Sequence, residues 1–328
     1  MAVSVKLFEH RDFRQLITRV AAERAVDEAW IEKDYYLSEV LRVIAETYPN
    51  QTMLKGGTSL SKGWLLLDRI SEDIDLFVDP EAFPRGANGK VIGQSALETH
   101  FKRLRDAIAK HPALNHDKNE SKSFGGFGRS DRFAYERTFD SRVFTIAPWV
   151  LVEAGVQSGR EPKETRRISS LIGEYATRIG QATMALDTGS FVMQVLHFRR
   201  TFVEKMFAIH GKVMRFMEDG TRIGRDARHY ADLYVLAAQP DVRAMLTNAE
   251  YERIRMDYDA NSRKYFAKSY RPPENLRFKS SAALFPTDEL RSELQRDYDS
   301  DVKPLFFGGA FPPFDRVLDR LKEIQALV

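Results

Sequence analysis

The sequence contains no cysteine. This absence excludes disulfide bonds, a thiolate nucleophile, cysteine-ligated zinc and iron–sulfur clusters. A chain without cysteine also suits a reducing compartment, so we expect a cytoplasmic protein.

Long apolar runs and a strong net charge are absent as well. No apolar run approaches the roughly 20 residues that a membrane-spanning helix needs. The first residues, MAVSVKLFEHRDFRQLI, lack the uninterrupted apolar stretch of a signal peptide, so we expect no membrane segment and no secretory signal. The 50 Lys and Arg residues nearly balance 47 Asp and Glu residues, and this net charge of +3 does not by itself indicate a nucleic-acid partner.

The composition that is present favours a folded protein of about two domains, because 43% of the 328 residues are hydrophobic. We predict a mixed α/β N-terminal domain over residues 1–188 and a helical C-terminal domain over 189–328. The expected helices lie within 8–48, after Gly57 with Thr58 or Ser59 as cap, and at 95–110, 191–217, 230–238 and from Phe314 onward. The expected strands lie at 52–55, 74–78, 142–146 and 149–156, and 115–132 is predicted to be a mobile loop or a hairpin tip.

The most informative segment is KGGTSLSKGWLLLDRISEDIDLFVD, residues 55–79. Asp73 and Asp75 are two apart, so on a strand both carboxylates point to one face, while Ile74 and its apolar neighbours fill the other. Two carboxylates so close repel each other, and a hard divalent cation with oxygen ligands relieves that repulsion. Upstream, Gly56 and Gly57 let backbone N–H groups approach a phosphate at a helix start.

Each of these features has an ordinary structural alternative. A lone Asp-x-Asp is usually a solvated strand face, and a lone Gly-Gly is usually a turn. Together, joined by one helix, they favour a phosphate-binding loop next to a metal-binding strand, which is the layout of nucleotidyl transfer.

Three further charged residues are candidates. Glu153 lies within an apolar strand segment, where it can supply a third metal ligand or a base, or simply face outward at an edge. Lys205 interrupts an apolar helical stripe and can neutralise triphosphate charge, or extend to solvent. Asp232 can orient Lys205 or a metal-bound water, or form a helix–helix salt bridge with an arginine, and the sequence leaves the choice between Asp226 and Asp232 open.

Basic residues gather in the second half of the chain. Residues 160–230 hold 13 Lys and Arg against 8 Asp and Glu, a local excess of five. We predict RNA phosphate contacts here, although charge runs are more often solvated faces. The candidates are Arg166, Arg167, Arg199, Arg200, Arg222, Arg225 and Arg228, and the 115–132 segment adds Lys118, Lys122, Phe124, Phe127, Arg129 and Arg132, a mixture found in single-strand binders.

At these residues the sequence resembles the AbiEii/AbiGii nucleotidyltransferase toxin family, which includes the MenT toxins. The similar segments are Ile31-Glu-Lys-Asp-Tyr-Tyr, Leu54-Lys-Gly-Gly-Thr-Ser-Leu-Ser-Lys, Arg69-Ile-Ser-Glu-Asp-Ile-Asp-Leu, Thr201-Phe-Val-Glu-Lys, Arg228-His-Tyr-Ala-Asp-Leu-Tyr and, less specifically, the tail around Arg296-Asp-Tyr-Asp and Phe306-Phe-Gly. The resemblance implies an α+β fold with a DNA polymerase β-like nucleotidyltransferase core and a helical C-terminal domain. It also implies a toxin of a toxin–antitoxin or phage-defence pair, with a cognate antitoxin, that extends the 3′ acceptor end of tRNA and blocks translation.

The resemblance assigns residues to roles. It implies that Asp73 and Asp75 bind metal, that Glu153 is the further strand carboxylate, and that Ser71, Lys205 and Asp232 are the family serine, lysine and aspartate. Val203 and Ala231 stand where family members often have Trp or Tyr, which leaves the nucleotide and acceptor preference open.

From residues and resemblance together we predict a nucleotidyltransferase that uses Mg²⁺, or Mn²⁺ in its place, and an NTP as substrate. The predicted nucleotide-binding residues are Gly56, Gly57, Thr58, Ser59, Lys62, Arg69 and Ser71. Transfer to a protein or small-molecule hydroxyl, and a catalytically inactive binding module, are the alternatives. Oligomeric state, preferred base and tRNA species are not determined by the sequence.

Overall fold

A computed structural model of the protein describes residues 5–67, 69, 71, 73–86, 89–141, 146–306 and 311–328. The chain forms two compact units. Unit 1 comprises Met1–Trp64, Ile70–Val156 and Lys163–Val195, and unit 2 comprises Leu65–Arg69, Gln157–Pro162 and Leu196–Val328. The main division, between Val195 and Leu196, lies seven residues after the boundary predicted from the sequence.

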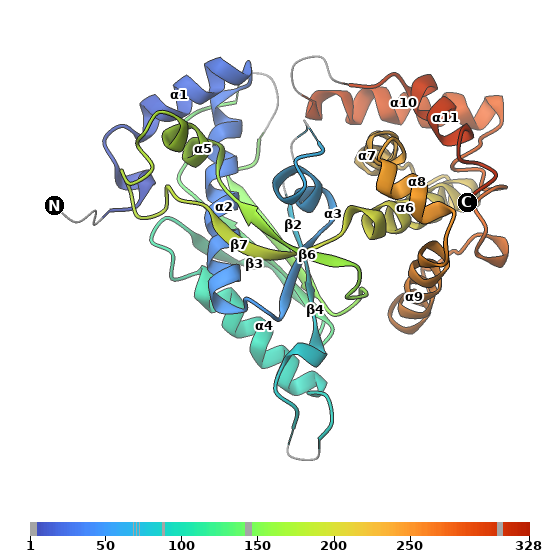
Figure 1. Cartoon of the computed structure of the whole chain (residues 1–328), viewed down its shortest axis with the longest axis horizontal. Helices are drawn as coiled ribbons and strands as arrows, with labels where there is room; N and C mark the ends of the chain where they lie inside the picture. Colours follow the sequence, from blue (N-terminus) through green and yellow to red (C-terminus); the bar gives the residue numbers. More distant parts are fainter. Residues whose placement is uncertain are drawn as a thin grey trace. The chain divides into compact units, whose positions relative to one another are not determined.

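The described part of unit 1 contains a seven-stranded mixed sheet in the order β3-β4-β5-β2-β1-β7-β6. Figure 1 draws the strands of this sheet as arrows. β2 lies parallel to β5 and antiparallel to β1, β1 is parallel to β7, and β4 is antiparallel to both β3 and β5. The strands are β1 (Thr52–Lys55), β2 (Asp73–Val78), β3 (Asn115–Ser123), β4 (Gly128–Ala134), β5 (Trp149–Gly155), β6 (Lys163–Ile168) and β7 (Phe191–Leu196).

Helices cover one face of this sheet. The helices of unit 1 are α1 (Phe13–Arg24), α2 (Glu28–Thr47), α3 (Gly56–Thr58), α4 (Gln94–Ile108) and α5 (Leu171–Arg178), with short turns η1 (Leu7–Glu9), η2 (Ser59–Gly63, a π-helical turn) and η3 (Pro80–Ala82). α2 contacts β5, α4 contacts β4, and the two helices contact each other. Ile74, Val152 and Phe133 are at most 3% exposed on the covered face, and burying such a side chain contributes about 1.5–3 kcal/mol.

Unit 2 is helical in its described part. Its helices are α6 (Phe198–Asp219), α7 (Arg228–Ala237), α8 (Pro240–Leu246), α9 (Ala249–Phe266), α10 (Asp288–Asp301) and α11 (Phe314–Lys322), with turns η4 (Gly224–Ala227), η5 (Glu274–Leu276) and η6 (Lys303–Leu305). α6 begins after His197, whose side chain accepts the Arg199 N–H, and ends at Gly220 with a positive φ. The Tyr230 ring meets the Phe314 ring edge-on in the core at 5.1 Å.

The mixed sheet and the helical C-terminal part confirm the predicted fold class, and the helices within 8–48, at 95–110 and 230–238 and the strands at 52–55, 74–78 and 149–156 are confirmed. No helix of the described residues has the length and apolar character needed to cross a membrane.

Two predictions of local structure were wrong, and one of the two alternatives for a third segment was correct. Residues 191–196 form a strand rather than the start of a helix, because this segment pairs in parallel with β1 through Leu54 and Val195. Residues 115–132 form the two strands of a hairpin rather than a mobile loop, so the hairpin alternative is correct. The helix after the glycines begins at Gly56 and stops at Gly63, so neither Thr58 nor Ser59 caps it. The strand expected at 142–146 falls almost wholly outside the described residues.

Candidate active site

The two aspartates of the central motif share one face of β2. Asp73 and Asp75 are half-buried, whereas Ile74 and Leu76 between and after them are fully buried. This alternation confirms the strand pattern predicted from the sequence. The acids therefore point away from the apolar core.

Glu153 lies on the same face as these aspartates. β2 and β5 run in parallel, and Asp75 is directly opposite Glu153 in their register. Register partners on neighbouring strands, whose backbones lie about 4.8 Å apart, point to the same side of a sheet. The fold thus brings Asp73, Asp75 and the exposed Glu153 into one acidic group, which we call the carboxylate face.

Gly56 brings the backbone against this face. Its φ is +70°, and a Cβ at this position would overlap the carboxylate of Asp75. Only glycine can adopt this left-handed conformation while its backbone lies so close to the Asp75 side chain. The start of α3 at Gly56 therefore lies next to an acid of the carboxylate face, and the first N–H groups of a helix have no partner within it, which suits contact with a phosphate.

The hydroxyl groups of this segment brace the loop. Thr58 donates to the Asp73 carbonyl and lies 2.7 Å from the Ser71 hydroxyl. Ser59 is fully buried and donates to the Gly56 carbonyl at 2.8 Å. The structure therefore does not present the Ser59 hydroxyl to a phosphate, and any contact from this residue would come from its backbone.

Lys62, a predicted phosphate contact, has partners within unit 1. Its ammonium forms an ion pair with Asp34 and donates to the Ser169 carbonyl at 2.9 Å. Asp34 in turn accepts the Leu171 N–H at 2.7 Å, so these contacts connect η2 to α2 and to the start of α5. This arrangement gives Lys62 a structural role.

The donor set of the carboxylate face suits a hard cation. Among the described residues, no group of three or more His, Asp and Glu side chains converges closely enough to enclose a metal ion. Mg²⁺, however, is usually held by one or two carboxylates, with waters and substrate phosphates as its other ligands. Asp73 and Asp75 on one face, beside the glycine backbone, fit that partial set.

A second polar cluster forms inside unit 2. Both oxygens of the Asp232 carboxylate accept from the Arg69 guanidinium, each at 2.7 Å, and Lys205 lies 2.7 Å from the same carboxylate. Asp232 is 0% exposed, and Arg69 and Lys205 are at most 5% exposed. Asp232 thus pairs with Lys205, which is one of the alternatives that the sequence left open, and with an arginine from a loop rather than from a helix.

Burial and charge set the pKa values of this cluster. Burial alone would raise the pKa of Asp232, but the charges and hydrogen bonds of Arg69 and Lys205 outweigh it and hold the pKa below its ordinary value. Burial lowers the pKa of Lys205 despite the attraction of Asp232. The carboxylate is therefore firmly ionised and holds the lysine ammonium in place.

One member of this cluster, His229, was not predicted from the sequence. The Nδ1 of His229 lies 3.3 Å from the Lys205 ammonium, and burial followed by the charge of Lys205 holds the pKa of His229 well below its ordinary value. The available signal was its spacing, because His229 precedes Asp232 by three residues on α7 and shares its helix face. Asp226, the other candidate aspartate, forms an ion pair with Lys212 at 2.6 Å instead.

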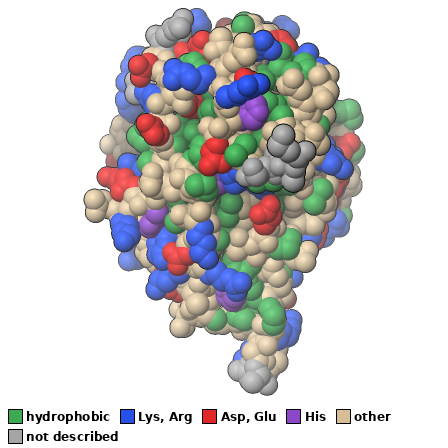
Figure 2. Space-filling model, turned by 90° about the vertical axis from the view of Figure 1, so that its left-hand side faces the viewer, with side chains coloured by type: hydrophobic (Ala, Val, Ile, Leu, Met, Phe, Trp, Pro, Cys, Tyr) green, Lys and Arg blue, Asp and Glu red, His purple; other side chains and the backbone are tan. Residues whose placement is uncertain are grey.

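The predicted RNA-contacting arginines of unit 2 differ in accessibility. Arg200 is 1% exposed and binds Glu204 at 2.9 Å and Asp257 at 2.7 Å, so it is unsuited to contact RNA. Arg199 is paired with Asp241 and Glu250, and Arg222 with Asp297. Arg225 is exposed and Arg228 is half-buried. Figure 2 draws a different face, the α1 and α5 side of unit 1, on which side chains of both signs are interspersed.

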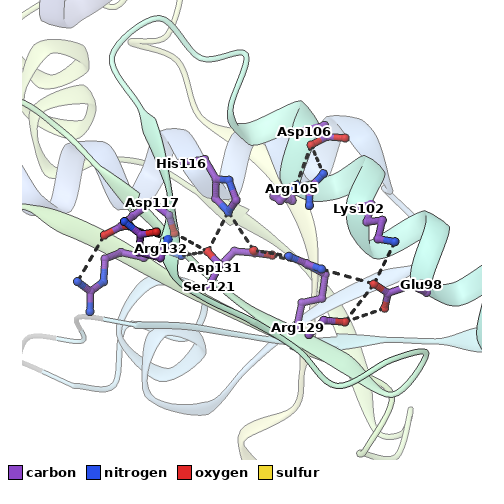
Figure 3. A network of polar contacts seen from close by, with 12 residues as sticks. Glu98, Lys102, Arg105, Asp106, His116, Asp117, Ser121, Arg129, Asp131 and Arg132 are labelled. Atoms are coloured by element: carbon purple, nitrogen blue, oxygen red, sulfur yellow. Dashed lines mark hydrogen bonds and ion pairs between the residues drawn. The ribbon is translucent and has the colours of Figure 1, made fainter.

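Of the cations predicted on the 115–132 segment, two turn toward other protein groups. Arg129 is 8% exposed and binds Asp131 through two hydrogen bonds of 2.9 Å, in a network that reaches Glu98 of α4 (Figure 3). Arg132 lies over the Trp149 ring and near Glu120. Lys118, Lys122, Phe124 and Phe127 remain exposed.

Two comparisons with known proteins complete the description. Residues 40–320 match the family model described as nucleotidyl transferase AbiEii toxin, type IV TA system. No curated protein matches the chain.

Proposed function

Since the chain belongs to the AbiEii nucleotidyl transferase toxins of type IV toxin–antitoxin systems, we propose that it transfers a nucleoside monophosphate from an NTP to the 3′-hydroxyl of an RNA. The acceptor end of tRNA is the proposed target. Extension of that end would prevent aminoacylation and so stop translation, and a cognate antitoxin would oppose the effect.

One observation carries this proposal. The carboxylate face places Asp73, Asp75 and Glu153 together, beside the Gly56 backbone that a side chain at that position would block. Acids of like charge next to a phosphate-accepting helix start suit a ligand that brings a divalent cation together with phosphate groups. An NTP with a divalent metal is such a ligand.

The chemistry follows from this arrangement. When bound, Mg²⁺ or Mn²⁺ would neutralise charge on the triphosphate and on the leaving pyrophosphate. Asp73 and Asp75 would hold it, and the N–H groups of Gly56 and Gly57 would bind phosphate oxygens. Glu153 would accept the proton of the attacking hydroxyl as the oxygen–phosphorus bond forms at the α-phosphate and the bond to pyrophosphate breaks. Lys205, held by Asp232, is proposed to supply positive charge.

The test uses the full chain, total tRNA, each α-labelled NTP and Mg²⁺. Asp73→Asn and Asp75→Asn should each lower label incorporation into RNA by about 10³-fold or more, because each removes a metal ligand. EDTA should abolish incorporation. Asp106→Asn, a change at an exposed acid of α4, is the matched control and should leave activity unchanged.

Three outcomes would contradict the proposal. Full activity of both Asn variants would remove the metal assignment. Label that enters protein or a small molecule instead of RNA would replace the acceptor. NTP binding without turnover on any acceptor would indicate a binding module.

A further inference from the structure

The β3–β4 hairpin of unit 1 separates its charged side chains between the two faces of the sheet. Arg129 and its register partner Ser123 point to the helix-covered face, where both contact Glu98 of α4. Figure 3 shows this network between the hairpin and α4. Lys122 is one residue before Ser123 and therefore points to the opposite face.

The acids of the carboxylate face also lie on that opposite side of the sheet. Lys122 is the register partner of Ser130, Ser130 of Glu153, and Glu153 of Asp75, so all four share one side of the sheet. Three strand spacings of about 4.8 Å place Lys122 roughly 14 Å from Asp75 along this row. Lys122 is exposed and forms no ion pair or side-chain hydrogen bond with any described residue.

The end of the hairpin exposes two aromatic side chains. Phe124 is 55% exposed and Phe127 is 39% exposed, within four residues of each other. Their backbone is held in place, because Phe127 accepts the Val156 N–H at 3.0 Å and a Cβ on Gly126 would overlap the backbone of Gln94 at the start of α4. A fixed turn thus presents aromatic rings to solvent.

We propose that this hairpin holds the single-stranded end of the acceptor RNA, with Lys122 on a phosphate and Phe124 stacked on a base. The inference rests on the proposed function for the identity of the substrate. Glu120 and Asp117 lie near Arg132, and Glu98 lies near Arg129 and Lys102, so these acids of the hairpin and of α4 each have a cation beside them. An exposed lysine beside exposed aromatic rings complements the phosphates and base faces of an unpaired strand.

The experiment measures binding of a fluorescein-labelled, unstructured RNA oligonucleotide to the full chain, separately from transfer. Phe124→Ala should weaken binding about 5- to 100-fold. Lys122→Ala should weaken it several-fold and reduce the slope of log affinity against log salt by about 0.7. Phe124→Tyr should bind as the unaltered protein does, whereas Phe124→Leu, which keeps apolar area without a ring, should bind like the alanine variant.

Lys110→Ala removes the same charge from an exposed position just after α4 and should change neither quantity. The Kd for NTP should be the same in all variants, because none of them changes Asp73, Asp75, Glu153 or the Gly56 backbone.

The outcomes separate this inference from the proposed function. If the unaltered protein extends RNA and the Lys122 and Phe124 variants bind RNA normally, the hairpin assignment is wrong and the proposed function stands. If the unaltered protein binds the oligonucleotide through the hairpin but labels no RNA, the proposed function fails and the RNA-binding surface stands. Loss of antitoxin protection in these variants, with RNA binding unchanged, would assign the hairpin to a protein partner and overturn the inference.

Discussion

The acids of the two units are chemically alike but lie in opposite surroundings. On the carboxylate face, Asp73 and Asp75 are half-buried, Glu153 is exposed, and all three carry the same sign of charge. In unit 2, Asp232 is fully buried between two cations, Arg69 and Lys205. Like charges near solvent gain from an external cation, whereas a buried acid needs its partners within the fold. We therefore expect the carboxylate face to bind a ligand. We expect Asp232 and its two cations to stabilise the fold in addition to any part in function.

The largest effect on stability is expected for removal of the Asp232 carboxylate. Asp232→Ala would leave two buried cations without their shared acid, which should lower the stability of unit 2 by about 3–5 kcal/mol. Asp73→Ala should change stability by less than about 1 kcal/mol while removing activity. Urea unfolding of both variants measures the difference, and equal losses for the two would contradict the comparison.

A change of pH tests the histidines of unit 2. His210 is buried beside the Ser281 hydroxyl at 2.7 Å, and burial lowers its pKa to about 4. Because the unfolded histidine titrates near 6.5, the unfolded state binds more protons below that pH, so stability should fall between about pH 6.5 and pH 4.

The loss expected from His210 over this range is about 3 kcal/mol. Measurement of the unfolding free energy of the protein and of His210→Gln at pH 7 and pH 4.5 gives the contribution. A pH dependence unchanged by the substitution would show that other groups cause it.

The smallest effect on stability is expected for Arg255. Within the described part of the chain, this buried cation has no acid placed against it as Asp232 is placed against Arg69. Its Nε and Nη1 have no hydrogen-bond partner among the described residues, and its nearest acid, Glu252, is 3.7 Å away. Arg255→Met should therefore be neutral or stabilise unit 2 by up to about 1 kcal/mol, since Met keeps most of the apolar contact. A loss above 2 kcal/mol in the same urea assay would show that the guanidinium has a partner that satisfies it.

The spacing of apolar and charged residues within one segment was enough to predict those features that depend only on neighbouring residues. The alternation of Asp73, Ile74 and Asp75 was enough to place both acids on one face, and the apolar spacing was enough to find α2 and α4. Register between distant strands was not available from the sequence, so the row from Lys122 to Asp75 and the strand at 191–196 could not be derived.

The same limit applies to the site. A contact between Asp232 and Lys205 was one of the alternatives that the sequence left open, but Arg69 was predicted to bind nucleotide because nothing local reveals a partner 163 residues away. From the sequence, Arg200 and Arg129 were expected to be cations on the surface. In the structure both are buried, and each forms an ion pair with an acid.

The separation between Arg69 and Asp232 has a consequence for biosynthesis. At roughly 5–20 residues per second, a ribosome needs about 8–33 s to proceed from one to the other. Every residue of unit 1 has been polymerised once Val195 is added, whereas the ion pair at the centre of unit 2 must wait for Asp232. A nascent chain therefore carries the complete acidic sheet face before the internal charges of its helical part can be matched.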